Sequence, residues 1–291
     1  MEFQMLESIL ALFLMQAPAA NNYDNAVNKL NEIAASNPAQ AQVITIGTND
    51  QGTPIKALKV GNGETASLVV ATHHGNEYGS TAVALGFAAS IAANPIQGQT
   101  VYIVPVLNVT GYNRNSRYEN NLETSIDANR DYPSPCKTDK AYRLKSTNAL
   151  ATFIDEKNIQ ISATLHTYWP AVVYPWGIST TDLTTPYEDT YKKLVADATK
   201  ESNYQTGNNT QVLYPADGTF EDYTYWKHGI WSLLFELGFS HSPDNTAIKN
   251  MVDVNTPGLR RFLENAPKKR VALHDFSGRC DSRAPKRVFL E

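Results

Sequence analysis

Apolar runs of strand length alternate along the chain with stretches of helical periodicity. The strand-like runs are short and rich in Val, Ile and Leu, whereas the helical stretches place apolar residues three and four positions apart. This alternation is typical of an α/β fold, in which helices cover the faces of the sheet between successive strands. We therefore predict a single α/β domain, with a mixed, mostly parallel twisted sheet and helices on both faces.

The predicted elements cover most of the chain. Strands are expected at 42–46, 55–60, 68–71, 101–107, 161–165 and 231–235. Helices are expected at 23–35, 80–92, 139–156, 187–201 and 246–264. No internal repeat or low-complexity linker separates these elements in the sequence, so they are expected to share one core.

Polar residues follow four of the predicted strands. His74 comes just after one strand and Asn108 after another, while His166 and Glu236 follow two more. Open α/β sheets bind ligands in the crevice beyond the carboxyl ends of their strands. These four side chains are therefore expected to share one cleft.

The composition narrows the classes of function. With 42% hydrophobic and 19% charged residues, the 291-residue chain has the balance of a globular protein with one large core. Its formal net charge of -4 supplies no positive field for a phosphate backbone. The densest basic stretch, 268–270, is typical of a solvated segment. Nucleic acid is therefore not an expected partner.

The first residues have features of an export signal. The apolar run 9–15 is too short to span a bilayer but has the length of a signal-peptide core, and Ala17-Pro18-Ala19 follows it as an Ala-x-Ala site. Residues 1–19 are therefore expected to be a signal peptide, and the protein to be secreted or periplasmic with no membrane span. Against this, Glu2 and Glu7 stand where export signals normally carry Lys or Arg.

The sequence does not decide whether the two cysteines are bonded, and its C-terminal part changes in character. Cys136 and Cys280 can form one disulfide in an oxidising compartment, or they can remain free thiols, because the sequence does not show whether they are close. From Pro267 onward the sequence becomes basic and irregular. We expect 20–266 to be the folded domain and 267–291 a tail on its surface.

The sequence HHGNEYGS at 73–80 carries the clearest candidate chemistry. It places His74 and Glu77 three residues apart at a strand-to-helix turn, a spacing that lets an imidazole and a carboxylate reach one zinc ion. A third ligand is needed to fix the metal and leave a position for water, and His166 is the best placed of the other histidines. The remaining histidines are expected to be solvated or hydrogen-bonded: His73, His228, His241 and His274.

This metal motif is the first of five segments that occur in a recognisable order. They are HGNE at 74–77, DANR at 127–130, HTY at 166–168, YPWG at 174–177 and the stretch 214–236. Together they resemble the zinc metallocarboxypeptidases of the carboxypeptidase A and B family, over about residues 23–236. The resemblance implies that 20–266 is a catalytic domain with one Zn²⁺ per chain, which hydrolyses the C-terminal bond of peptides or proteins.

The resemblance also implies roles in the chemistry. Glu236, which follows an apolar strand, would take a proton from the zinc-activated water and pass it to the leaving amine. Arg117, six residues after Gly111, would stabilise the oxyanion, with Arg114 as the alternative. Asp127 would accept the second ring N–H of His74.

Further residues are implied in substrate binding. Asn129 and Arg130 would clamp the terminal carboxylate of the substrate, because a guanidinium matches a carboxylate with two hydrogen bonds. Tyr214 would close over the bound end. Glu221 precedes Asp222 at the position that forms the floor of the family's side-chain pocket, where an acid goes with C-terminal Lys or Arg.

The sequence also leaves alternatives for the function. Glu221 can instead point to solvent, in which case Phe220 or a neighbour would shape a pocket for aromatic or aliphatic ends. NVTG at 108–111 stands where the family usually has Asn-Pro-Asp-Gly, and one extra residue lies before Gly229. The nearest rival is a deacylase or amidase of the same zinc fold, acting on N-acyl amino acids or cell-wall peptides. A noncatalytic peptide-binding module is disfavoured, because neither Glu236 nor a zinc ligand is lost.

Overall fold

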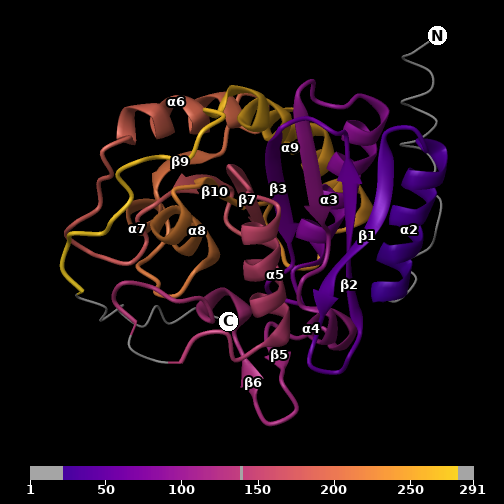
Figure 1. Ribbon diagram of the computed structural model, residues 1–291, viewed down its shortest axis with the longest axis horizontal. Helices are drawn as coiled ribbons and strands as arrows, with labels where there is room; N and C mark the ends of the chain where they lie inside the picture. The colour runs from indigo at the N-terminus through magenta and orange to yellow at the C-terminus, as the bar shows by residue number, and fades with distance from the viewer. Residues whose placement is uncertain (1–21, 138–139, 281–291) are drawn as a thin grey trace.

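The computed structural model describes residues 22–137 and 140–280 (Figure 1). The predicted signal peptide, 1–19, and the last part of the predicted tail, 281–291, lie outside the described residues. Eight strands form one sheet in the order β1-β2-β4-β3-β7-β10-β8-β9. Their bounds are β1 (Ala41–Thr48), β2 (Pro54–Val60), β3 (Thr65–Ala71), β4 (Gln99–Val104), β7 (Ile161–His166), β8 (Ala171–Tyr174), β9 (Gln205–Asn208) and β10 (Trp231–Glu236).

The centre of the sheet is parallel and its flanks are mixed. Strands β4, β3, β7 and β10 run parallel to one another, whereas the β1–β2, β2–β4 and β8–β10 pairs are antiparallel. Figure 1 shows β1 and β2 at one end of the molecule and β9 at the other. Every residue of β7 is buried, as expected of a strand covered on both faces. The predicted single α/β domain with a mostly parallel sheet is confirmed.

Two groups of helices pack on the sheet. Helices α2 (Tyr23–Ser36), α3 (Tyr78–Ala93), α6 (Glu188–Ala198) and α9 (Asn245–Asn265) form a contiguous group, in which α9 contacts both α3 and α6. Helix α5 (Lys145–Glu156) packs on β1, and α8 (Phe220–His228) packs on β10 and β7. No helix in the described part of the chain is long and apolar enough to cross a membrane.

Short elements complete the loops beside the central strands. They are α4 (Val109–Arg114), the hairpin of β5 (Glu119–Asn120) and β6 (Ser125–Ile126), the 3₁₀ turn η1 (Ala128–Arg130) and α7 (Asn209–Val212). The sequence pattern predicted none of these, nor β8, β9 and α8. Strand β8 is only four residues long, which is too short to show a clear period.

The predicted helix at 139–156 begins later, at Lys145. Buried Asp131 explains the delay, because its carboxylate accepts hydrogen bonds from the backbone N–H groups of Arg143 and Leu144, each at 3.0 Å. These bonds hold the preceding residues as a loop. The predicted strand at 101–107 likewise ends early, at Val104.

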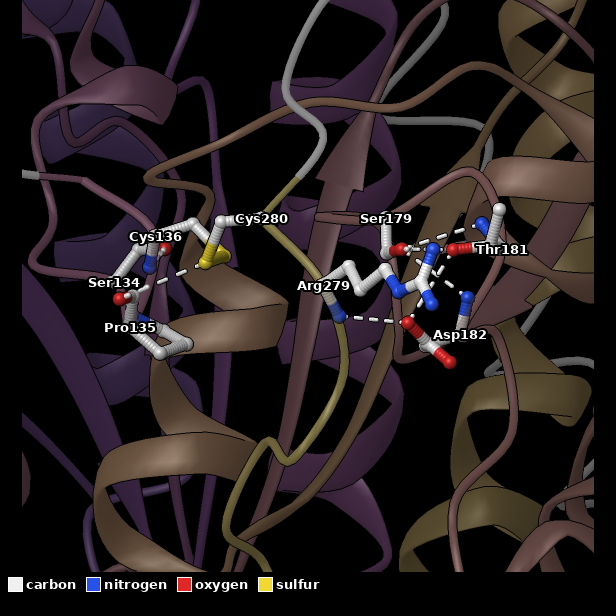
Figure 2. The surroundings of a disulfide bond; sticks show 8 residues. All are labelled: Ser134, Pro135, Cys136, Ser179, Thr181, Asp182, Arg279 and Cys280. Carbon is white, nitrogen blue, oxygen red and sulfur yellow. Dashed lines mark hydrogen bonds between the residues drawn. A yellow bond between two sulfur atoms is a disulfide. The ribbon is translucent and has the colours of Figure 1, made fainter.

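The described part of the predicted tail is fastened to the domain. Cys136 and Cys280 form a disulfide, with their Cα atoms 5.1 Å apart (Figure 2). The adjacent Arg279 donates its backbone N–H to Asp182 (2.6 Å). Val271 is buried, and the ring of Phe276 packs against the core. The segment after α9 is therefore part of the packed structure up to Cys280.

Candidate active site

The parallel strands bring the predicted site residues to one edge of the sheet. His74 follows β3, while His166 and Glu236 are the last residues of β7 and β10 and are paired in register across the two strands. All three line one pocket. Asn108 does not line this pocket, so its predicted place in the cleft is wrong. Its buried side chain instead forms backbone hydrogen bonds, including one to Gly111 N (2.7 Å).

The metal-binding trio is fully formed. Atoms of His74, Glu77 and His166 that can bind a metal all lie within 4.8 Å of one another, and the three residues are buried. The two Nδ1 atoms are 3.3 Å apart. Two ligands of a tetrahedral zinc, each about 2.0–2.1 Å from the metal, would be separated by roughly that distance. The residue types, separation and burial therefore fit one zinc ion, and the predicted ligand set is confirmed.

The outer nitrogen of each imidazole is also engaged. His74 Nε2 lies 3.0 Å from Asp127 Oδ1, and His166 Nε2 lies 3.2 Å from Thr164 Oγ1. Asn129 Nδ2 is 3.4 Å from the same His166 nitrogen. With these partners, both Nδ1 atoms face the trio. Of these partners, Asp127 and Thr164 can accept an N–H from the outer nitrogens, which orients both rings and favours the tautomers with Nδ1 unprotonated, whereas the Asn129 amide only packs against the His166 ring.

A glycine allows the turn that carries the first two ligands. A Cβ built on Gly75 would lie 2.1 Å from the carbonyl carbon of Gly111. The turn between β3 and α3 can therefore pack against α4 only because residue 75 lacks a side chain. This packing places His74 and Glu77 on the same side of the turn.

Opposite charges compensate one another around the trio. Burial raises the pKa of Glu77, but attraction to His74 and His166 outweighs burial and lowers this pKa below the usual range of a carboxyl. Burial likewise raises the pKa of Asp127, but attraction to His74 and Arg117 lowers it far below its usual range. Both acids are therefore held as carboxylates.

Arg117 is the arginine that reaches this centre. Its Nη2 donates to Asp127 Oδ2 (2.8 Å), and its Nη1 lies 3.2 Å from His74 Nδ1. Arg114, the alternative, is exposed on α4. The structure thus places a guanidinium, fixed by Asp127, beside the metal-binding atoms.

A pocket opens beside the trio. Glu221, which is fully buried in α8, lines it together with Glu236, Arg130 and Tyr214. Arg130 Nη2 donates to the Tyr214 hydroxyl (3.3 Å). The alternative in which Glu221 points to solvent is therefore wrong, because the first turn of α8 faces the pocket.

Asn129 also lines the pocket, but its amide already has contacts within the protein. Its Oδ1 accepts the backbone N–H of Phe220 (2.8 Å), in addition to the contact of its Nδ2 with His166. Asn129 thereby connects the start of α8 to the metal-binding trio.

Glu236 forms no ion pair in the described part of the chain. Its Oε2 is buried and has no hydrogen-bond partner in the described part of the chain. Burial, and secondarily the charge of Glu77, raise the pKa of Glu236 well above its usual range. A carboxyl of raised pKa beside a metal centre is suited to accepting and returning a proton.

The remaining histidines have local partners, as expected. His73 is buried, and its Nε2 lies 2.9 Å from the Tyr132 hydroxyl. His228 contacts Tyr223, and His274 contacts the backbone of Trp226. His241 contacts Thr167 (3.4 Å).

Sequence reasoning missed Asn209, the first residue of α7. Asn209 lines the pocket, and its Nδ2 donates a 2.6 Å hydrogen bond to Glu221 Oε1. In the sequence it stands in the polar run GNNT at 207–210, which resembles an ordinary turn. No spacing rule distinguishes this asparagine from its neighbour Asn208.

Solved structures share this fold. Bovine thrombin-activatable fibrinolysis inhibitor, in complex with tick carboxypeptidase inhibitor, has a TM-score of 0.75 at 20% identity, covering 85% of this chain and 99% of that chain. Carboxypeptidase A from Helicoverpa armigera has a TM-score of 0.73 at 16% identity, covering 91% and 80%. Murein-tripeptide amidase from Escherichia coli O157 is more distant, at 0.52 and 15%, covering 75% and 91%.

Sequence comparison identifies the family. Human carboxypeptidase B is 27% identical over 253 residues, which are 71% of this chain and 60% of that protein. Human mast cell carboxypeptidase A is 25% identical over 268 residues, 76% and 61% of the two chains. The chain thus spans less than two thirds of the length of these relatives. The sequence profile of zinc carboxypeptidases matches residues 26–257. With this match and an intact His74, Glu77 and His166 trio, the chain belongs to the zinc carboxypeptidase family.

Proposed function

We propose that the protein removes single residues from the C-termini of peptides by zinc-dependent hydrolysis. The observation that carries the proposal is the adjacency of two features at one strand edge. A complete zinc-binding trio lies directly beside a pocket lined by Arg130, Tyr214 and Glu221. A peptide whose last side chain fills the pocket would present its final peptide bond to the metal centre.

A zinc ion held by His74, Glu77 and His166 would supply an acidified water and polarise the scissile carbonyl. Glu236 takes the proton of that water on its unpartnered carboxylate and delivers it to the leaving amine. Arg117, held in place by Asp127, stabilises the negative charge that develops on the carbonyl oxygen. Asp127 also keeps the His74 ring in its metal-binding tautomer.

The other residues that line the pocket bind the substrate. Arg130 pairs with the terminal carboxylate of the peptide, and the Asn129 amide assists from the turn before it. The Tyr214 hydroxyl, which now contacts Arg130, shifts toward the bound end. Glu221 receives the departing side chain, and its buried charge favours C-terminal Lys or Arg.

The free terminal carboxylate separates this function from its rivals. We expect the zinc-loaded protein to shorten a peptide with a free C-terminus by one residue and to leave the C-terminally amidated version intact. Chelation of zinc should stop the reaction. Mass spectrometry of both peptides gives the result, and equal cleavage of the amidated peptide would refute the proposal.

An amidase acting on cell-wall peptides is the second candidate. Its support is the shared fold with murein-tripeptide amidase. Hydrolysis of murein tripeptide or N-acyl amino acids, without release of C-terminal residues from longer peptides, would favour that candidate. The pocket lined by Arg130, Tyr214 and Glu221 supports the carboxypeptidase instead.

We further propose that the protein works outside the cytoplasm. The disulfide between Cys136 and Cys280 supports this, since such bonds persist in oxidising compartments. The expected signal peptide at 1–19 supports it as well. Detection of the protein in the medium or periplasm, beginning near Ala20, tests the proposal.

A further inference from the structure

The carboxylate of Glu221 is bound in the pocket by a neutral amide and not by a cation. No Lys, Arg or His forms an ion pair with this carboxylate in the described part of the chain, and Arg130 influences it only at longer range. Its Oε1 is bound by the amide of Asn209 at 2.6 Å. Its Oε2 is buried and has no hydrogen-bond partner at normal geometry within the same described residues. The Thr219 side chain and the Glu221 backbone N–H nevertheless lie close enough to lower the pKa of this carboxyl, against the larger effect of burial, which raises it.

A neutral partner has a different effect from a charged one. An ion pair inside the protein would cancel the charge of Glu221 and leave no field for a ligand. An amide satisfies one oxygen and fixes the rotation of the carboxylate, but leaves the net charge in place. The second oxygen is then available to a cationic side chain that enters the pocket.

The Asn209 amide lies where a side chain on residue 177 would otherwise stand. A Cβ built on Gly177 would lie 2.6 Å from Asn209 Nδ2 and 3.0 Å from its Cγ. The missing side chain of Gly177 therefore provides the space that the amide occupies. Helix α7 is also tied to the same loop, because Thr210 Oγ1 donates to Ser179 O (2.9 Å).

We propose that Asn209 is a specificity-determining positioning residue, which orients Glu221 for a cationic C-terminal side chain and depends on Gly177 for its own position. This inference rests on the proposed function, because it assumes that the pocket receives the last side chain of a peptide. It adds that the preference for a basic end requires three residues from three separate segments: Gly177, Asn209 and Glu221.

The test compares peptides that end in arginine or citrulline. These side chains have nearly the same shape, so the ratio of their kcat/KM values isolates the contribution of charge. Replacing Asn209 with leucine keeps the size of the side chain but removes its donor. Loss of a hydrogen bond to a charged group predicts a fall of about tenfold to a hundredfold in the ratio for Asn209→Leu. Most of the change is expected in KM for the arginine peptide.

Two further variants make the test decisive. Gln211→Leu introduces the same residue at an exposed position of α7, and should leave the ratio unchanged. Gly177→Ala retains the Asn209 amide but displaces it, and should lower the ratio in the same direction. It also serves if Asn209→Leu does not fold. Zinc content and melting temperature are measured for every variant.

The outcomes separate this inference from the proposed function. If Glu221→Ala abolishes the arginine preference while Asn209→Leu and Gly177→Ala retain it, Asn209 is not a positioning residue and the inference is wrong. If Glu221→Ala also leaves the ratio unchanged, the proposed basic preference fails, and the inference fails with it. Release of C-terminal residues with either result would leave the carboxypeptidase proposal standing.

Discussion

The two halves of the cleft hold their buried acids in opposite ways. In the metal half, Glu77 and Asp127 are surrounded by His74, His166 and Arg117, and their pKa values are lowered. In the pocket half, burial raises the pKa of Glu221. Among the residues that line the pocket, Glu221 Oε2, Glu236 Oε2 and Thr219 Oγ1 are buried and lack hydrogen-bond partners in the described part of the chain.

This difference indicates what each half is built to receive. The metal half has a geometry set by its own hydrogen bonds, which orient the ligand side chains toward one another. The pocket half carries the cost of unsatisfied buried acceptors, which a bound substrate can relieve. The first half is therefore suited to a metal, and under the proposed function the second is completed by the substrate.

The largest effect is expected from breaking the metal half. His166→Ala removes one of three zinc ligands, and the two that remain should not retain the ion during dialysis. Zinc content measured by mass spectrometry should fall from one per chain to near zero, with loss of peptidase activity. Unchanged zinc content, or full activity in the metal-free protein, would contradict the assignment.

The next effect is expected at the boundary between the halves. Glu236→Gln keeps the shape of the side chain but removes its ability to accept a proton. We expect kcat to fall at least about 100-fold, while zinc content and peptide binding change little. Steady-state kinetics and calorimetric titration with a peptide measure the two quantities. Activity within a few fold of the unaltered protein would remove Glu236 from this role.

A smaller effect is expected from the pocket half, where Glu221→Ala removes the charge. Truncating one partner of a buried pair costs about 2–5 kcal/mol, which corresponds to a loss of roughly 30-fold to several-thousandfold in kcat/KM for peptides ending in Arg or Lys. Peptides ending in Leu or Phe should lose much less. The comparison of four matched peptides measures this selectivity, and an unchanged ratio would show that Glu221 does not set it.

The smallest effect is expected for Glu119, a buried acid outside the cleft that serves as a comparison for the acids inside it. Glu119 is buried in the β5–β6 hairpin, where its Oε2 accepts a hydrogen bond from Ser146 (2.6 Å). Burial raises the pKa of Glu119 to about 8. A raised pKa therefore does not by itself mark a functional acid.

The sign of the Glu119 effect follows from proton linkage. Between its unfolded pKa of about 4.3 and its folded pKa of about 8, the folded protein retains a proton that the unfolded chain has released. The contribution of Glu119 to stability therefore falls as the pH rises through this window. The melting temperature of Glu119→Gln should equal that of the unaltered protein near pH 4 and should be higher by at least about 2–4 °C near pH 8. An equal melting temperature at both pH values would contradict the buried, protonated state.

Much of the site could be predicted because its residues stand at strand ends. Parallel strands bring their carboxyl ends together, so His74, His166 and Glu236 could be assigned to one cleft from their sequence positions alone. Asn108 followed the same rule and failed, because its amide is used by nearby backbone groups. Position at a strand end does not fix the direction of a side chain.

Other features depend on contacts between distant segments. The hydrogen bond from Asn209 to Glu221 joins helices α7 and α8, and its geometry requires Gly177 from a third segment. The disulfide spans 144 residues of sequence. Local periodicity carries no information about such contacts, so neither feature could be predicted from the pattern of apolar and polar residues.

The most direct test of both halves uses one peptide that ends in Leu-Arg with a free carboxylate. Mass spectrometry over time should show loss of arginine alone when the protein is zinc-loaded, a much slower loss of the leucine then exposed, and no reaction after chelation. The metal half predicts the dependence on zinc, and the pocket half predicts the pause after arginine. Cleavage at an internal bond, or activity without zinc, would contradict the account, and loss of leucine as fast as arginine would contradict the role of the pocket.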